Sequence, residues 1–258
     1  MEPIKRIVDV DIGDRVATIT LNSPHNRNAL SRALLVQLAD ALRVTSGRDD
    51  VSVVVLTGVD PVFCAGADLK EQTEEHVPNQ VGLIDIMVAI DRHTCPVVAR
   101  VAGPARAGGI GLLAACDIAI GLTDATFAFT EVKIGVVPAV ISLPVFERMG
   151  TVVAHQYFLT GETFSAIRAA ETGLLNAVVA ASELDNEVDR IVGLLKEAGP
   201  NASTETKKLR RRYGGPIRIE LLNELQTLST SFFASGEGQE GIAAFREKRT
   251  PAWMQFAS

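Results

Sequence analysis

The sequence contains few of the residues that bind metals or form disulfides. It has three cysteines and four histidines among 258 residues. Cys64, Cys95 and Cys116 lie far apart, with no C-x-x-C motif and no histidine pair nearby. That spacing excludes a disulfide framework and the usual zinc patterns. We therefore expect reduced thiols and no metal site.

The chain also lacks long apolar runs and an excess of positive charge. No stretch reaches the ~18 apolar residues that a membrane helix needs, and residues 1–19 contain no apolar signal core. The net charge of −6 argues against binding to nucleic acids or anionic membranes. We expect a cytoplasmic protein in which any anionic ligand meets locally placed lysines and arginines.

What the sequence does contain is an alternation of strand and helix patterns up to about residue 150, followed by mostly helical patterns. The expected strands are 15–21, 51–58, 95–103, 117–121 and 126–130. The expected helices are one capped by Ser31, then 80–93, the run "GLLAACD", 151–159, 165–173, 182–198, 203–212, 216–234 and 237–248. This order predicts an α/β protein with a helical C-terminal region.

Four glycines crowd the stretch "GPARAGGIGLLAACD", residues 103–117. Its G-x-G-x-x-A pattern, with Glu131 twenty residues beyond Gly111, is compatible with a dinucleotide site. However, "PARA" separates these glycines from the preceding strand, which weakens that interpretation. Two alternatives are glycines that allow close helix packing and the floor of an active site.

The stretch "VFCAGADLKE", residues 62–71, places a turn of small residues after a buried strand. Such a turn exposes backbone N–H groups, which can stabilise an oxyanion. Cys64 lies within it, but no base is placed in the sequence to activate its thiol. A buried structural thiol is the favoured interpretation of Cys64.

Glu131 is a single carboxylate in an apolar neighbourhood, "TFAFTEVKIGVVPAVISLPVF". Burial raises the pKa of a carboxyl group, and this makes a proton donor and acceptor suited to neutral pH. The alternative is a surface ion pair between Glu131 and Lys133 or an arginine.

Together these stretches resemble the crotonase, or enoyl-CoA hydratase/isomerase, superfamily. The resemblance extends over almost the whole chain, through "ITLNSPHNRNALS", "FLTGETFSAIRAAETGLLNAVV" and "EGIAAFREKRTPAW". It implies a crotonase-like spiral of repeated ββα units with a C-terminal helical trimerisation region. It also implies a core with the acyl-CoA site at residues 1–195, a region for oligomerisation at residues 196–258, and a homotrimer or hexamer.

By motif position, the resemblance makes the backbone N–H groups of Ala67 and Gly108 the oxyanion hole. Glu131 matches the second of the two acids that many family hydratases carry, whereas Gly111 stands where the first acid is found. Gly111 and Ala139, the latter in "VVPAVIS", are expected in the substrate pocket. The open volume beside Gly111 could admit a branched acyl group, or the glycine could simply ease helix packing.

One carboxylate suffices for two reactions. Glu131 could activate water and protonate the α-carbon of an enoyl-CoA, or move a proton between two carbons of the acyl chain. Some branches similar to methylglutaconyl-CoA hydratase combine a glycine at the first acid position with a "P-A-x-I-S" turn. That resemblance favours a hydratase of lipid metabolism, with an isomerase and a catalytically silent acyl-CoA binder as alternatives.

The resemblance also places coenzyme A against the "NRNAL" turn, the "AGADLK" segment and the C-terminal tail. The residues that inherit these contacts are Arg27, Ala29, Ala65, Asp68, Leu69, Lys70, Phe245 and Lys248. Coenzyme A is part of the substrate here, so we expect no separate cofactor.

Overall fold

The computed structural model describes residues 6–71, 81–213 and 235–255 of the chain. It divides into two compact units, Met1–Val192 and Gly193–Ser258. The predicted boundary lies between residues 195 and 196. The prediction also assigns the acyl-CoA site to the first part and the oligomer contacts to the second part, and these assignments stay predictions.

The larger sheet of the first unit has six strands in the described residues, in the order β1-β2-β3-β4-β6-β9. They are β1 (Val8–Gly13), β2 (Val16–Leu21), β3 (Val53–Gly58), β4 (Val97–Val101), β6 (Ile118–Leu122) and β9 (Ala177–Val179). Only β1 runs antiparallel to its neighbour. Every residue of β3 is buried, as expected for a parallel strand covered on both faces.

A smaller sheet contains β5 (Ala105–Arg106), β7 (Thr126–Ala128) and β8 (Phe164–Ser165). β5 and β7 are parallel, with Ala105 opposite Phe127. Since the carboxyl ends of parallel strands meet at one edge of a sheet, the segments that follow β5 and β7 begin close together.

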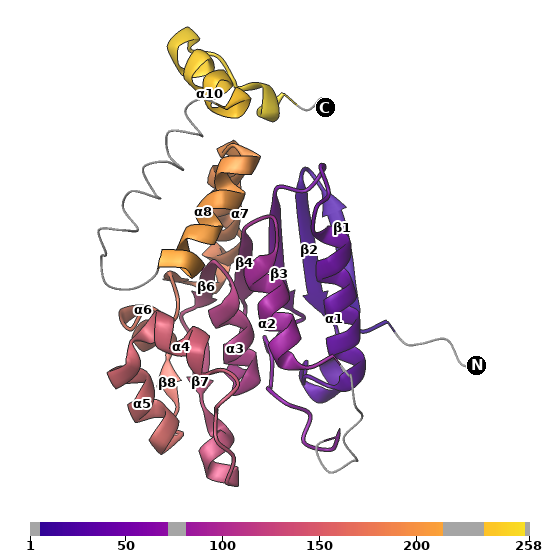
Figure 1. Ribbon diagram of the computed structural model, residues 1–258. Helices are drawn as coiled ribbons and strands as arrows, with labels where there is room; N and C mark the ends of the chain where they lie inside the picture. The colour runs from indigo at the N-terminus through magenta and orange to yellow at the C-terminus, as the bar shows by residue number, and fades with distance from the viewer. Residues whose placement is uncertain (1–5, 72–80, 214–234, 256–258) are drawn as a thin grey trace, which may run out of the picture. The chain divides into compact units, whose positions relative to one another are not determined.

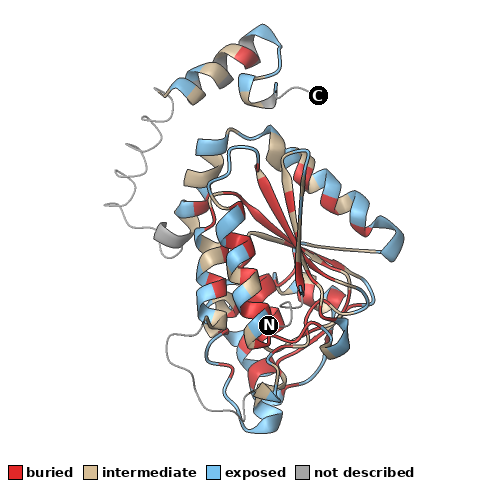
Figure 2. Ribbon diagram, turned by 90° about the vertical axis from the view of Figure 1, so that its right-hand side faces the viewer, coloured by how far each residue is buried: buried red, intermediate tan, exposed pale blue. Residues whose placement is uncertain are grey.

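Three helices cover one face of the larger sheet side by side: α1 (Arg32–Thr45), α2 (Leu83–Arg92) and α3 (Gly108–Ala115) (Figure 1). α1 buries leucines at helical spacing, and its N-cap Ser31 accepts a hydrogen bond from the Leu34 N–H, as predicted. Figure 2 shows the buried residues of this unit gathered along the strands. The chain continues through α4 (Ser142–Met149), α5 (Thr151–Thr160), α6 (Ala166–Glu171) and α7 (Leu184–Glu197).

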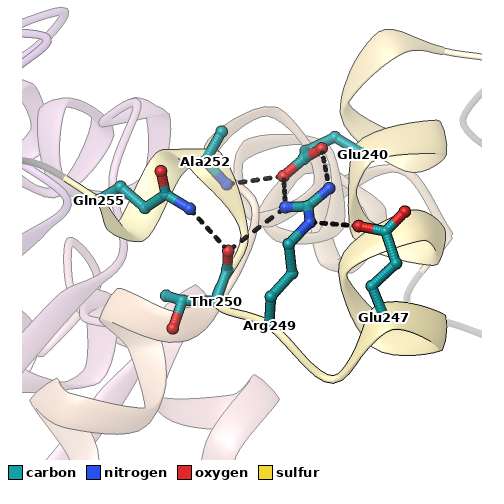
Figure 3. A network of polar contacts seen from close by, with 6 residues as sticks. All are labelled: Glu240, Glu247, Arg249, Thr250, Ala252 and Gln255. Atoms are coloured by element: carbon teal, nitrogen blue, oxygen red, sulfur yellow. Dashed lines mark hydrogen bonds and ion pairs between the residues drawn. The ribbon is translucent and has the colours of Figure 1, made fainter.

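The second unit contains α8 (Pro200–Tyr213), α10 (Gly236–Glu247) and a short 3₁₀ turn (Ala252–Met254). Glu237 accepts hydrogen bonds from the backbone N–H groups of Asn201 and Ala202 in the first turn of α8. Arg249 binds both carboxylate oxygens of Glu240, at 2.6 and 2.9 Å (Figure 3). The tail that follows α10 is therefore tied back onto that helix.

The alternation of strands and helices is confirmed, but several elements were not predicted. They are β1, the short strands β5, β8 and β9, and α4. α4 contains Pro144, which a helix tolerates in its first turn because the N–H groups there have no partner within the helix. The predicted helix 216–234 lies outside the described residues. No helix in the described ranges is long and apolar enough to cross a membrane.

Candidate active site

The "NRNAL" turn and the "AGADLK" segment are joined by backbone hydrogen bonds. The Ala65 N–H donates to the Arg27 carbonyl at 3.1 Å, and the Leu30 N–H donates to the Gly66 carbonyl at 2.8 Å. The structure thus brings both predicted coenzyme A segments to one place. These segments hold Arg27, Ala29, Ala65, Asp68, Leu69 and Lys70, of which Arg27, Leu69 and Lys70 are exposed.

Asn28 holds this turn in place, a role that the sequence analysis missed. Its side chain is fully buried; its Oδ1 accepts from the Ser23 N–H at 2.9 Å and its Nδ2 donates to the Val62 carbonyl at 2.8 Å. The φ of Asn28 is +56°, a left-handed conformation that asparagine tolerates better than most residues. An asparagine within a polar turn was the available signal.

The segment 62–67 is attached along its length to residues 104–107. The Phe63 N–H donates to the Pro104 carbonyl at 3.1 Å, and the Arg106 N–H donates to the Cys64 carbonyl at 3.0 Å. Gly66 has a φ of +89°, and a Cβ there would lie 2.9 Å from the Arg106 carbonyl oxygen. Only glycine combines this conformation with so close an approach of two backbones.

The predicted oxyanion donors, Ala67 and Gly108, come together at the start of α3. A Cβ built on Gly108 would lie 4.0 Å from the Ala67 nitrogen. As the first residue of α3, Gly108 has no partner within the helix for its N–H. Ala107, just before it, has a φ of +49°, rare for alanine, and donates its own N–H to the Ala128 carbonyl at 3.0 Å. Such strain often marks a functional site.

Cys64 is a structural thiol. It is fully buried, its Sγ donates to the Asn28 carbonyl at 3.1 Å, and burial raises the pKa of the thiol to about 12. A thiol with so high a pKa is not ionised at neutral pH and is a poor nucleophile. A Cβ on Gly109 would lie 2.8 Å from the Cys64 Cβ, so close packing accounts for that glycine.

Glu131 lies in the 3₁₀ turn Thr130–Ile134, directly after β7. Because β5 and β7 are parallel, this turn begins at the same sheet edge as α3. The Glu131 Oε2 is buried and has no hydrogen-bond partner among the described residues. Burial raises the pKa of this carboxyl. Among the described residues Glu131 forms no ion pair with Lys133 or with an arginine, which speaks against the alternative of a surface ion pair.

The space beside Gly111 is filled. A Cβ on Gly111 would lie 2.4 Å from the Ile141 Cγ2 and 3.4 Å from the Met87 Sδ. The expected open volume for a branched acyl group is therefore wrong, because Ile141 occupies it. The glycine allows close packing, as the simpler interpretation proposed. The dinucleotide pattern loses support because β5 and a strained alanine separate these glycines from β4.

Three of the predicted residues, Ala139, Phe245 and Lys248, belong to other segments of the chain. Ala139 is exposed in the turn before α4, where its carbonyl accepts from the Ser142 Oγ at 2.7 Å. Phe245 lies in α10, and its side chain is outside the described structure. Lys248 is exposed directly after α10, with a φ of +54°. Both belong to the second unit, whose placement relative to the first is not determined.

Comparison with known proteins identifies the family. The family model described as enoyl-CoA hydratase/isomerase matches residues 11–256. The chain belongs to the enoyl-CoA hydratase/isomerase family.

Named relatives and solved structures of this family support the assignment. The human enoyl-CoA hydratase domain-containing protein 3, mitochondrial, is 33% identical over 250 residues, covering 93% of this chain and 81% of that protein. An enoyl-CoA hydratase from Mycobacterium smegmatis matches with a TM-score of 0.90 and 33% identity, covering 96% of this chain and 99% of that one. One from Bacillus anthracis matches with a TM-score of 0.87 and 30% identity, covering 95% and 98%. The predicted crotonase-like fold is confirmed.

Proposed function

We propose that this family member hydrates enoyl-CoA thioesters, adding water across the 2,3 double bond with Glu131 as the single acid and base. The observation that carries the proposal is the buried, unpartnered Oε2 of Glu131. It follows β7 at the sheet edge where α3 also begins. An ordinary surface carboxylate has neither this burial nor this raised pKa.

The neighbouring N–H groups of Ala67 and Gly108 suit the thioester oxygen. When water adds to the β-carbon, negative charge develops on that oxygen, and two fixed N–H dipoles stabilise it. Glu131 takes a proton from the water molecule while the water oxygen bonds to the β-carbon. Glu131 then gives that proton to the α-carbon. The thioester regains its carbonyl and Glu131 its charge, so the cycle needs no further reactant or separate cofactor.

Coenzyme A would lie against the joined "NRNAL" and "AGADLK" segments. Arg27 and Lys70 are exposed there and can bind its phosphates. Because the whole protein is acidic, phosphate binding needs such local cations. The Asn26 Nδ2 donates to the Asp68 Oδ2 at 3.1 Å, a further hydrogen bond between the two segments. Phe245 and Lys248 of the tail are proposed to reach the coenzyme of a neighbouring subunit.

An assembly of several copies is proposed on the exposed apolar side chains after Glu131. Val137 is 76% exposed and Leu143 is 80% exposed, and other apolar side chains nearby are also exposed. Apolar surface of this kind is typical of subunit contacts. We therefore propose a homotrimer or hexamer, which light scattering after size exclusion measures directly.

Isomerisation of a 3-enoyl-CoA is the second candidate. The observation in its favour is the apolar contact at Gly111, the position of the missing first acid: the three atoms nearest to a Cβ built there belong to Ile141 and Met87. A water molecule would be held there by fewer groups, while Glu131 alone could remove a proton and return it two carbons away.

Product analysis separates these functions. The parent protein is incubated with crotonyl-CoA and, separately, with a 3-enoyl-CoA, and the products are resolved by chromatography. A 3-hydroxyacyl-CoA from crotonyl-CoA supports hydration, and a 2-enoyl-CoA from the 3-enoyl substrate supports isomerisation. Calorimetric binding without either product would identify a silent acyl-CoA binder and contradict both.

A further inference from the structure

Ile141 covers the α3 backbone at the position where two-acid relatives would carry a carboxylate. Its Cγ2 would be 2.4 Å, and its Cβ 3.1 Å, from a Cβ on Gly111. Ile141 is only 2% exposed and lies at the N-terminal end of α4, where its carbonyl accepts from the Val145 N–H at 3.2 Å. The side chain is therefore fixed by burial and by the start of the helix.

Gly111 and Gly108 lie on the same side of α3, because residues three apart in a helix share a face. One helical turn, ~5 Å, separates them. A Cβ on Gly108 would contact Leu83 and Leu30 at 2.9 and 3.0 Å, while one on Gly111 would contact Met87 and Ile141. We call these four side chains, Leu30, Leu83, Met87 and Ile141, the apolar strip.

The apolar strip begins at the proposed thioester site and ends at Ile141. A thioester oxygen bound at Gly108 places the carbonyl carbon there as well, and the third and fourth acyl carbons lie about one helical turn away. Ile141 would therefore meet the acyl group near its β-carbon. Leu83 and Met87, four residues apart on α2, would line the path to it.

We propose that Ile141 determines which acyl groups this site accepts, favouring chains that are unbranched at the β-carbon. This inference rests on the proposed acyl-CoA function. Ile141 and Gly111 act as a matched pair: the bulk that relatives carry at the first acid position is supplied here from α4, as hydrocarbon in place of a carboxylate. An extra methyl group on the β-carbon would have to displace a buried side chain.

Binding of saturated acyl-CoAs tests the proposal without relying on turnover. Calorimetry compares butyryl-CoA with 3-methylbutyryl-CoA on the parent, on Ile141→Ala and on Ile167→Ala, an exposed isoleucine on α6 that serves as the matched control. We expect the parent to prefer the unbranched ligand, and Ile141→Ala to shift the affinity ratio towards the branched one by about 10-fold, within the range for one methyl group in an apolar pocket. Ile167→Ala should keep the parental ratio.

An unchanged ratio in Ile141→Ala would overturn the role of Ile141, and retained hydration of crotonyl-CoA would show that the proposed function survives. If the parent binds neither acyl-CoA, the proposed function fails and the inference fails with it. Should Ile141→Ala not fold, Ile141→Leu removes the branch at Cβ while keeping the side-chain volume. We then expect a smaller shift of the affinity ratio towards 3-methylbutyryl-CoA.

Stability measurements test the contact itself. Gly111→Ala in the parent forces a methyl group against the Ile141 Cγ2, so we expect the melting temperature to fall by about 5 °C. Ile141→Ala removes the Cγ2 at 2.4 Å and leaves only the Cβ at 3.1 Å, so most of the fall in melting temperature caused by Gly111→Ala should disappear in that background. Ile141→Val keeps Cγ2 and should not relieve it. Equal losses from Gly111→Ala in all three backgrounds would overturn the pairing.

Discussion

Two segments border the proposed site, and they are held in different ways. Residues 62–67, attached to 104–108, form what we call the clamp; residues 131–141 form the acid segment. The clamp is fixed by backbone hydrogen bonds between distant parts of the chain, such as Arg106 to Cys64. In the acid segment the backbone bonds are local, such as Val136 to Glu131, and many of its side chains are exposed.

Because of this difference, the clamp and the acid segment differ in what they can contribute to a reaction. The clamp acts through backbone N–H groups and glycines, so it can serve any reaction that places charge on a thioester oxygen. The acid segment contributes one carboxylate, Glu131, and one apolar side chain, Ile141. In the proposed function, the choice between hydration and isomerisation, and between acyl groups, would therefore depend on the acid segment.

Removing the charge of Glu131 should have the largest effect. Glu131→Gln keeps the shape of the side chain but cannot accept a proton, so kcat should fall by roughly 10²–10⁴-fold. Acyl-CoA binding should remain, because the clamp is unchanged. Steady-state kinetics and calorimetry measure the two quantities. Glu171→Gln, at an exposed glutamate paired with Arg168, is the matched control. Parental kcat in Glu131→Gln would remove Glu131 from the mechanism.

Gly66→Ala should damage the folding of the clamp. It combines a φ of +89° with a Cβ only 2.9 Å from the Arg106 carbonyl, a backbone atom that cannot easily move. We expect a loss of about 1–3 kcal/mol in the free energy of unfolding. Gly47→Ala is the control, since Gly47 also has a positive φ of +76° but open space around it. Equal losses in a urea titration would mean that the contact with Arg106 contributes nothing.

Gly108→Ala should reduce activity more than stability. The added methyl group meets the ends of two flexible side chains, Leu83 and Leu30, and alanine favours a helix over glycine. It also narrows the approach to the Ala67 and Gly108 N–H groups, and a displaced thioester reacts more slowly. We expect kcat/KM to fall roughly tenfold or more with a melting temperature near that of the parent. A large stability loss with unchanged kcat/KM would show that Gly108 is a packing residue.

The pH dependence of the reaction should report the burial of Glu131. A general base works only when deprotonated, so the acidic limb of kcat/KM follows its pKa in the free enzyme. Burial raises that pKa, and the limb should lie above the pH at which an ordinary glutamate titrates. For stability the direction is opposite: the raised pKa means that ionised Glu131 is disfavoured in the folded protein, so stability falls as pH rises from the ordinary glutamate pKa through the raised one. A limb at the ordinary value would indicate an exposed carboxylate.

The sequence predicted the parts of the site that depend on residue type. The glycine-rich turns, the isolated acid and the capping Ser31 each have local chemical requirements, so they could be recognised without a structure. The structure confirms the α/β order and brings Ala67 next to Gly108. The roles of these residues in binding and catalysis stay predictions.

The rest depends on contacts between distant residues, which local patterns do not contain. Gly111 lies thirty residues before Ile141, and nothing in either stretch shows that one fills the space of the other. Met87 was missed for the same reason, since its role follows from burial against other segments. The two-residue strand β5 is too short to show an alternating pattern.

The smallest expected effect concerns the C-terminal tail, which belongs to neither segment. Arg249 and the Ala252 N–H both bind Glu240 and hold its pKa well below the usual range, at about 2. A lowered pKa means that this ion pair stabilises the tail above the ordinary glutamate pKa and is lost as pH falls towards 2. Because the groups are exposed, salt should weaken the effect.

Glu240→Gln should therefore barely change the melting temperature. If Lys248, beside Arg249, binds coenzyme A as proposed, the variant should raise KM for acyl-CoA by a few-fold, roughly what the loss of one surface ion pair allows, and leave kcat unchanged. Glu205→Gln, which removes an exposed pair with Lys208, is the control. A fall in kcat would mean that the tail acts on the acid segment, and an unchanged KM would remove Lys248 from the coenzyme site.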